Sequence, residues 1–369
     1  MPALLPGGST VNEAPGPPLT SIYYNPTRYC NLACSHCWLA PQRATPERLE
    51  AEDVLDAAGW TDVLDQAMAL GLTGVKYTGG EPFLFPELPR FLRLAHERGL
   101  HQWFETNLTV LGDDLLATLT EISPLLISVS LDHVDPQVHD RLRASPGAFA
   151  ATRSNLEKLI AAGLEVQLTL TLQRSNKDAI EPLGDLAARL GATSLKVNIL
   201  QPIGRGRERQ TEHLGLPLEE LLDFHAALHT RWGARPTLIF DLPIAFKSSD
   251  QLQRAAQCRC NILETLGLLA DGSLSLCGIG TFVEGLHFGN VRRDRLEPVW
   301  RRHPTLLKLR EDVPSRLTGV CGRCLFRSFC LGGCRAEAYY REGNLHAPFW
   351  FCAEAERLGL FPKSRHRPS

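Results

Sequence analysis

Residues 21–38 read SIYYNPTRYCNLACSHCW, a short run of β-forming residues followed at once by three cysteines. These cysteines, Cys30, Cys34 and Cys37, have a C-x3-C-x2-C spacing. Zinc sites usually take four ligands, and their cysteines often come in C-x2-C pairs. A triplet that stops at three therefore raises the question of the fourth ligand. The spacing alone leaves open a zinc knuckle that borrows a distant ligand, or three unrelated thiols.

The segment that follows contains no cysteine between positions 38 and 257, and it alternates strand and helix patterns. The strand-like runs are SIYYN (21–25), GVKYTGG (74–80), HQWFETN (101–107), PLLISVSLD (124–132), LEVQLTLTL (164–172) and SLKVNIL (194–200). Helical patterns fall at 53–70, 86–99, 112–120, 148–162 and 177–190. Repeated βα units predict parallel strands with helical crossovers. Six units are fewer than a complete eight-fold barrel has, so we expect an α/β fold with a partial, TIM-like (β/α)6 barrel.

Unusual residues stand where these strands end. The cysteine triplet follows the first strand, GGEP (79–82) the second, ETN (105–107) ends the third and SLD (130–132) the fourth. In barrels of this kind the chemistry is located at the carboxyl ends of the strands. The sequence therefore predicts one site at that end of the barrel.

A C-x3-C-x2-C triplet after the first strand, followed by GGEP after the second, resembles the radical S-adenosylmethionine (SAM) enzymes. In that family three thiolates hold a [4Fe–4S] cluster, and the amino and carboxylate groups of SAM take the fourth iron. The resemblance implies that the reduced cluster cleaves SAM to a 5′-deoxyadenosyl radical, while the protein supplies geometry and excludes water. It also answers the question of the fourth ligand and disfavours the zinc interpretation.

The resemblance further implies which residues contact SAM. His36 takes a position that packs near the adenine, and the absence of Cβ atoms in the glycines lets the backbone approach the SAM amino group. An arginine can pair with the SAM carboxylate through two parallel hydrogen bonds. Solvated strand-end residues are the alternative for these positions. The expected cofactor-binding residues are His36, Gly79, Gly80, Glu81, Pro82, Thr106, Asn107, Ser130, Asp132 and Arg143.

A second group of cysteines occupies the C-terminal third of the chain. Gly272-x4-Cys277 is followed by CGRCLFRSFCLGGC (321–334) and by Cys352. This order resembles the SPASM domain, a C-terminal extension of radical SAM enzymes that carries auxiliary iron–sulfur clusters. By that pattern Cys258, Cys260, Cys277 and Cys334 hold one [4Fe–4S] cluster, and Cys321, Cys324, Cys330 and Cys352 hold another, which makes three clusters in all. A zinc ribbon is the alternative for 321–334, and the ligation of Cys258 is open.

The expected organisation is a flexible arm (1–20), the barrel (21–210), a helical bridge (211–257), the SPASM domain (258–355) and a C-terminal tail (356–369). The charge is nearly balanced, with 39 basic and 41 acidic residues, so no overall field favours nucleic acid or an anionic membrane. The start lacks the basic region and apolar run of a secretory signal, and clustered cysteines indicate metal chemistry in a reducing compartment. A cytoplasmic location is therefore expected.

The resemblance implies an oxidoreductase that cross-links or oxidises a ribosomally made peptide or protein. Its expected partners are that substrate and a one-electron donor such as flavodoxin or ferredoxin. A separate peptide-recognition protein is also expected, unless a cleft between the barrel and the C-terminal domain recognises the peptide by itself. A tetrapyrrole-modifying enzyme of the haem pathway is the alternative enzyme class, because that branch of the family has a similar cysteine-rich tail and this chain contains CGRC. Sulfatase maturation is less favoured, because those enzymes carry an aspartate where this chain has Gly278. A non-catalytic iron–sulfur electron carrier or zinc scaffold would not need GGEP. No catalytic side chain is identified.

Overall fold

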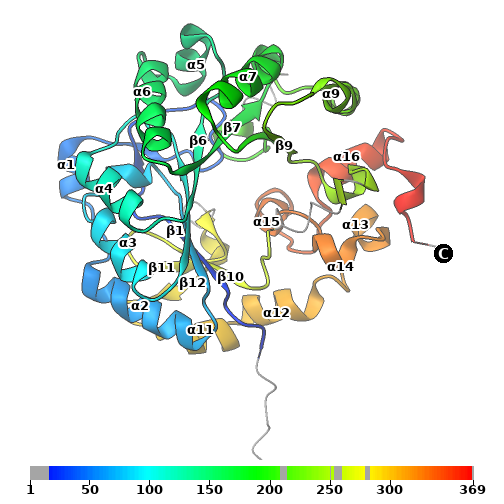
Figure 1. Cartoon of the computed structure of the whole chain (residues 1–369). Coiled ribbons are helices and arrows are strands. Elements are labelled where there is room, and N and C mark those ends of the chain that lie inside the picture. The colour runs from blue at the N-terminus through cyan, green and yellow to red at the C-terminus, as the bar shows by residue number, and fades with distance from the viewer. Residues whose placement is uncertain (1–15, 208–213, 250, 253–259, 279–282, 368–369) are drawn as a thin grey trace, which may run out of the picture.

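The computed structural model describes residues 16–207, 214–249, 251–252, 260–278 and 283–367, and its centre is one twisted sheet (Figure 1). Ten strands form this sheet in the order β12-β11-β10-β1-β4-β5-β6-β7-β8-β9. Their bounds are β1 (Ser21–Tyr24), β4 (Gly74–Tyr77), β5 (His101–Thr106), β6 (Leu126–Ser130), β7 (Glu165–Leu172), β8 (Ser194–Ile199), β9 (Thr237–Phe240), β10 (Thr265–Leu268), β11 (Ser273–Ser275) and β12 (His287–Asn290). The strands β2 (Tyr29–Cys30) and β3 (Gln42–Arg43) pair with each other.

The expected fold class is confirmed. The six strands predicted from the sequence are adjacent and parallel, from β1 to β8. The five predicted crossover helices are present as α2 (Ala57–Ala69), α3 (Leu88–His96), α4 (Asp113–Glu121), α6 (Ala148–Ala161) and α7 (Ile180–Leu190). Figure 1 shows these helices on the outside of the sheet. The short helix α5 (Pro136–Arg143) was not predicted, because its mostly polar sequence, PQVHDRLR, gives no apolar periodicity.

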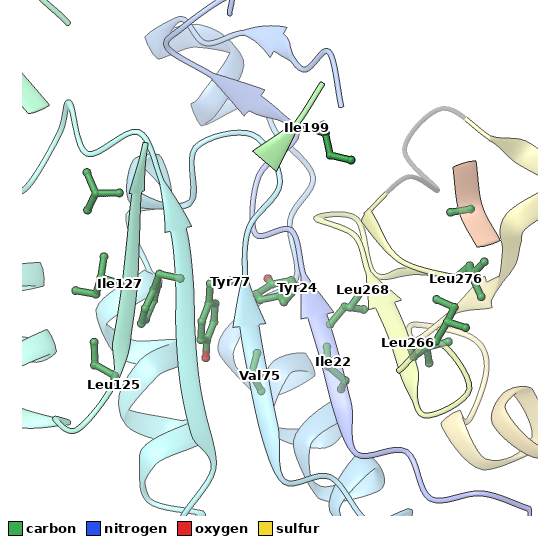
Figure 2. Close-up of a cluster of buried hydrophobic side chains, with 14 of the residues drawn as sticks. Ile22, Tyr24, Val75, Tyr77, Leu125, Ile127, Ile199, Leu266, Leu268 and Leu276 are labelled. Atoms are coloured by element: carbon green, nitrogen blue, oxygen red, sulfur yellow. The ribbon is translucent and has the colours of Figure 1, made fainter. Parts of the chain in front are cut away.

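The two faces of the barrel strands differ in polarity. The face towards the helices is apolar: Tyr24 stacks on Trp60 of α2, with ring centroids 4.8 Å apart, and lies parallel to Phe91 of α3. Figure 2 shows part of this buried face, with Ile22, Tyr24, Val75, Tyr77 and Ile127 on neighbouring strands. The alternate residues face the inside of the barrel, where they are polar and only partly buried. They include Tyr23, Lys76, Glu105, Ser128, Ser130, Thr169 and Lys196. Closed barrels usually fill this space with branched apolar side chains, so the polar inner face is suited to contact a ligand.

The sheet continues beyond the six predicted strands on both sides. The predicted helical bridge contains α9 (Leu218–Arg231) and also strand β9, which pairs in parallel with β8. On the other side β10, from the cysteine-rich region, pairs in parallel with β1. These strands, TLIF and TLGL, were not predicted from the sequence, because they lie in the regions expected to be a helical bridge and a cysteine-rich domain. The domain boundaries expected at residues 210 and 257 stay predictions. The sheet crosses both of them, because it includes β9 from the bridge and β10 from the cysteine-rich region.

The C-terminal region is helical and packs back on the barrel. Its helices are α11 (Leu296–Arg302), α12 (Pro304–Asp312), α13 (Gly319–Arg323), α14 (Arg327–Cys330), α15 (Arg335–Glu342) and α16 (Trp350–Arg357). Helix α11 contacts α2, and α16 contacts α9. Figure 1 shows α13, α14 and α16 together near the C-terminus. The predicted tail is attached there, since Leu325 N donates to Arg365 O.

The remaining short elements are helix α1 (Pro46–Glu50) and the 3-10 turns η1 (Pro82–Leu84), η2 (Arg174–Ala179), η3 (Ile244–Phe246), η6 (Glu284–Leu286) and η7 (Lys363–Arg365). Most of the predicted N-terminal arm (1–20) lies outside the described residues. Within the described ranges, no helix combines the length and the apolar composition that a membrane-spanning segment needs.

Candidate cofactor site

The loop after β1 brings the cysteine triplet together at the carboxyl end of the barrel. Cys30 and Cys34 are buried and form a small cluster with Leu32 and Ala148, against which Cys37 packs. Burial raises the pKa of the Cys30 thiol to about 12, and the nearby Glu81, Cys34 and Cys37 add to the increase. The three thiols are therefore close enough to interact electrostatically. The structure records all three as free cysteines.

Three thiols with N–H groups around them are the kind of ligand set that holds an iron–sulfur cluster. Among the described residues, no group of three or more His, Cys, Asp or Glu side chains is arranged to hold one metal ion. Peptide and amide N–H groups also face the sulfurs: Leu32 N lies 3.4 Å and Asn107 Nδ2 3.7 Å from Cys30 Sγ. Such donors stabilise the thiolates that cluster binding requires.

The GGEP loop is packed directly on the cysteine loop. Gly79 has a φ of 106°, a conformation that favours glycine. A Cβ atom on Gly80 would collide with the carbonyl of Tyr29, the residue before Cys30. The structure therefore gives these glycines a packing role, and the expected approach of SAM to their backbone stays a prediction. Pro82 is buried and begins η1.

Glu81 joins the ends of β4 and β5 through a buried carboxylate. Its Oε1 accepts from Thr106 Oγ1 at 2.6 Å and from Phe83 N at 3.1 Å, and its Oε2 accepts from Asn107 N at 2.7 Å. Burial raises the pKa of Glu81 to about 7, although these hydrogen bonds oppose the increase. Glu81 and Thr106, both predicted as cofactor contacts, thus bond to each other and hold the loop that carries Asn107.

A Glu81→Gln variant should have a lower melting temperature than wild type near pH 5, because an amide N–H would then face a backbone donor. The difference should narrow as the pH rises. A carboxyl whose pKa is raised from 4.5 to about 7 by folding contributes stability that is present below 4.5 and lost as the pH passes 7. Glutamine does not titrate, so only wild type loses this contribution.

The measurement is the anaerobic melting temperature of both proteins at pH 5, 6, 7 and 8. Glu87→Gln is the matched control, because the Glu87 side chain is exposed and lies 3.7 Å from Arg90. It should follow wild type at every pH. A Glu81→Gln difference that stays constant or widens between pH 5 and 8 would show that folding does not raise the pKa of this carboxyl.

Asp132, at the end of β6, is the centre of a buried polar group. Its side chain is fully buried, and its Oδ2 lies 2.8 Å from Arg143 Nε and 3.6 Å from His36 Nε2. Thr171 N donates to its Oδ1. Although burial alone would raise it, the pKa of Asp132 is held below its ordinary value by Arg143 and His36. Of the predicted SAM contacts, His36, Asp132 and Arg143 thus contact one another, while Ser130 lies on the partly exposed inner face of β6.

The inner face also contains charged residues that the sequence analysis missed. Lys76 Nζ lies 2.6 Å from Glu105 Oε1, and Thr78 Oγ1 donates to Glu105 Oε2. Burial alone would raise the pKa of Glu105, but Lys76 and Lys196 hold it down to about 2. Alternation along GVKYT, HQWFET and SLKVNI would have identified these positions, because every second residue of each strand faces inward.

The first predicted auxiliary set gathers around Tyr23 of β1. Burial raises the pKa of Tyr23 well above its usual value, and the thiols of Cys260, Cys277 and Cys334 contribute to the increase. Gly267 of β10 allows this arrangement, since a Cβ atom there would lie 2.8 Å from Cys277 Cα. The fourth predicted ligand, Cys258, lies outside the described residues.

The second predicted auxiliary set lines one pocket. Cys321, Cys324, Cys330 and Cys352 line it together with apolar residues that include Ala245, Val320 and Phe361. Phe349 N lies 3.4 Å from Cys321 Sγ, and Phe326 N lies 3.4 Å from Cys324 Sγ. The buried guanidinium of Arg335 donates to the carbonyls of Leu345 and Ala347. It also interacts with two thiols of this set, Cys321 and Cys330, and with Cys334 of the first set. These four thiols, with their N–H donors, also suit a cluster.

Comparison with known proteins agrees with this geometry. Residues 24–187 match the model of the radical SAM superfamily, and residues 258–325 match SPASM, an iron–sulfur cluster-binding domain. An AdoMet-dependent heme synthase of Methanosarcina barkeri is 28% identical over 340 residues, covering 88% of this chain and 93% of that protein. A PqqA peptide cyclase of Xanthomonas oryzae is 27% identical over 331 residues, covering 89% and 86%.

The fold is also similar to a solved structure, SuiB of Streptococcus suis bound to its precursor peptide SuiA. The TM-score is 0.71 at 17% sequence identity, over 91% of this chain and 76% of that chain. Iron–sulfur clusters and SAM are the cofactors that the two matched domains imply, and the described cysteines fit them. The chain is therefore a radical SAM enzyme with a C-terminal SPASM domain.

Proposed function

We propose that the enzyme cleaves SAM reductively at the Cys30, Cys34 and Cys37 site and oxidatively modifies a ribosomally made peptide or protein, by cross-linking or by oxidation. When bound, the cluster supplies the electron that cleaves SAM to a 5′-deoxyadenosyl radical. The other predicted cysteines hold two further [4Fe–4S] clusters, and flavodoxin or ferredoxin is the proposed electron donor.

The observation that carries this proposal is the inner face of the barrel. It is polar and partly exposed, and at Tyr23 it borders Cys260, Cys277 and Cys334. A substrate on this face would lie between the end of the barrel where SAM binds and a set of auxiliary thiols. Removing a hydrogen atom and then one electron and one proton amounts to a two-electron oxidation of the substrate. The auxiliary site offers a place for that electron.

Two relatives support a peptide as the substrate. One curated relative is named PqqA peptide cyclase, and the solved SuiB structure contains a precursor peptide. A tetrapyrrole is the second candidate, because other relatives of similar identity are named AdoMet-dependent heme synthase. Sulfatase-type maturation is not supported, because this chain has Gly278 where those enzymes carry an aspartate. There is also little room for a side chain there, since a Cβ atom on Gly278 would lie 3.1 Å from Asn25 Nδ2.

The test is to co-express the enzyme with any short precursor encoded beside its gene and to weigh the peptide. Loss of two hydrogens, or of a multiple of two, is expected with wild type and not with Cys37→Ala. An unmodified peptide, together with decarboxylation of a tetrapyrrole by the purified enzyme, would move the assignment to the second candidate.

A further inference from the structure

The end of helix α5 is attached to the middle of the cysteine triplet. The last carbonyls of this helix accept hydrogen bonds from the loop: Ser35 N donates to Leu142 O at 3.0 Å, and Ala33 N donates to Arg143 O at 3.3 Å. The two donors flank Cys34 on either side. Helix α5 therefore fixes the backbone on both sides of Cys34. Arg143 is the last residue of this helix and lies beside Cys34.

The side chain of Arg143 faces the sulfur of Cys34. Its Nη1 donates to Cys34 Sγ at 3.6 Å, and its Nε lies 2.8 Å from Asp132 Oδ2. Asp132 is itself held by Thr171 N. The guanidinium is thus ion-paired with a fixed carboxylate, while another of its N–H groups points at the thiol. Arg143 and Cys34 are each 7% exposed and Asp132 is 0% exposed, so solvent screens this contact poorly.

No other charged donor is recorded at a sulfur of the triplet in the described part of the chain. Cys30 Sγ meets an amide and a peptide N–H, both neutral. Arg205 also reaches the loop, but its Nε donates to the carbonyl oxygen of Cys34, at 2.7 Å. Arg143 is therefore the cation directed at a ligand atom, in addition to any contact that it makes with SAM.

We propose that Arg143, oriented by Asp132, raises the reduction potential of the cluster held by Cys30, Cys34 and Cys37. Reduction adds a negative charge to the cluster, and a buried guanidinium hydrogen-bonded to a ligand sulfur stabilises that charge. Hydrogen bonds to the sulfurs and nearby charge are among the factors that set iron–sulfur potentials. Asp132 is the positioning residue, because it fixes which N–H points at Cys34. This inference rests on the cluster assignment and not on the identity of the substrate.

The experiment is an anaerobic potentiometric titration of the holoenzyme without SAM, followed by electron paramagnetic resonance. The signal that changes when SAM is added identifies the triplet cluster. Arg143→Gln should shift its potential to more negative values, and Arg143→Lys, which keeps the charge, should restore part of the shift. Arg141→Gln is the matched control, because it removes an exposed arginine from the same helix. Its potential should equal that of wild type.

An unchanged potential in Arg143→Gln with full iron content would overturn the proposal, even if substrate modification were as proposed. If that variant does not retain the cluster, wild-type enzyme labelled with 15N-arginine provides the second measurement. Pulsed paramagnetic resonance of its reduced triplet cluster should then detect an arginine nitrogen, and Arg143→Lys should lose this coupling. Absence of the coupling in wild type would also overturn the proposal.

Discussion

Replacing Cys30, Cys34 and Cys37 together with alanine is expected to abolish the formation of 5′-deoxyadenosine. The same variant should lose about four of about twelve irons per chain, since each four-iron cluster needs its own thiolates. Cys30 and Cys34 are buried beside the GGEP loop with the partly buried Cys37 packed against them, and the structure describes no other cysteine in that group. No other thiol of the described residues lies there to replace them as a ligand.

The measurement is iron content after anaerobic reconstitution, with 5′-deoxyadenosine quantified after addition of dithionite and SAM. The irons of the C-terminal sets serve as the internal control, because about eight should remain in a folded chain. Continued SAM cleavage by the triple variant would place the cluster elsewhere and refute the site assignment.

Replacing Cys324 or Cys330 with alanine should not abolish SAM cleavage: 5′-deoxyadenosine still forms, and the modified product does not. Both thiols line the C-terminal pocket together with Val320 and Phe361, and no residue of the triplet loop lines it. The cysteines of this pocket thus have no described contact through which they would act in SAM cleavage. We expect them to serve the oxidation of the substrate.

Cluster binding and folding are coupled, so each variant must first be shown to be folded, by circular dichroism and by the irons that it retains. Arg327→Gln is the matched control, since Arg327 lines the same pocket without offering a thiol. If a folded Cys324 or Cys330 variant lost SAM cleavage as completely as product formation, the proposed division of labour would be wrong.

Much of the barrel was predictable from the sequence, because buried strands and amphipathic helices have distinct periods. The runs LISVSLD and LEVQLTLTL alternate between a helix-facing and an inward-facing residue, and both are strands at the expected places. Strands β9 and β10 were missed because they lie in regions expected to be a helical bridge and a cysteine-rich domain, and because their pairing depends on distant partners. The position of β10 beside β1 follows from tertiary packing, which brings residue 265 level with residue 21.

The candidate site was predictable as a set of residues and not as a set of contacts. The triplet spacing and GGEP identified the loops, since these motifs are local. Which side chains pair with one another is a property of the fold: Glu81 accepts from Thr106, and Arg143 meets Asp132 and Cys34. Helix α5, which creates the last of these contacts, has too few apolar residues to be recognised before the structure is known.

A radical formed at the triplet site is expected to take a hydrogen atom from a peptide. The most direct measurement uses a perdeuterated form of the precursor peptide that is modified on co-expression, incubated with reconstituted enzyme, SAM and dithionite. We predict deuterium in the 5′-deoxyadenosine. For each modification, the peptide product should have lost one deuterium together with a second atom, either hydrogen or deuterium. 5′-Deoxyadenosine that carries no deuterium while the peptide is modified would contradict this expectation.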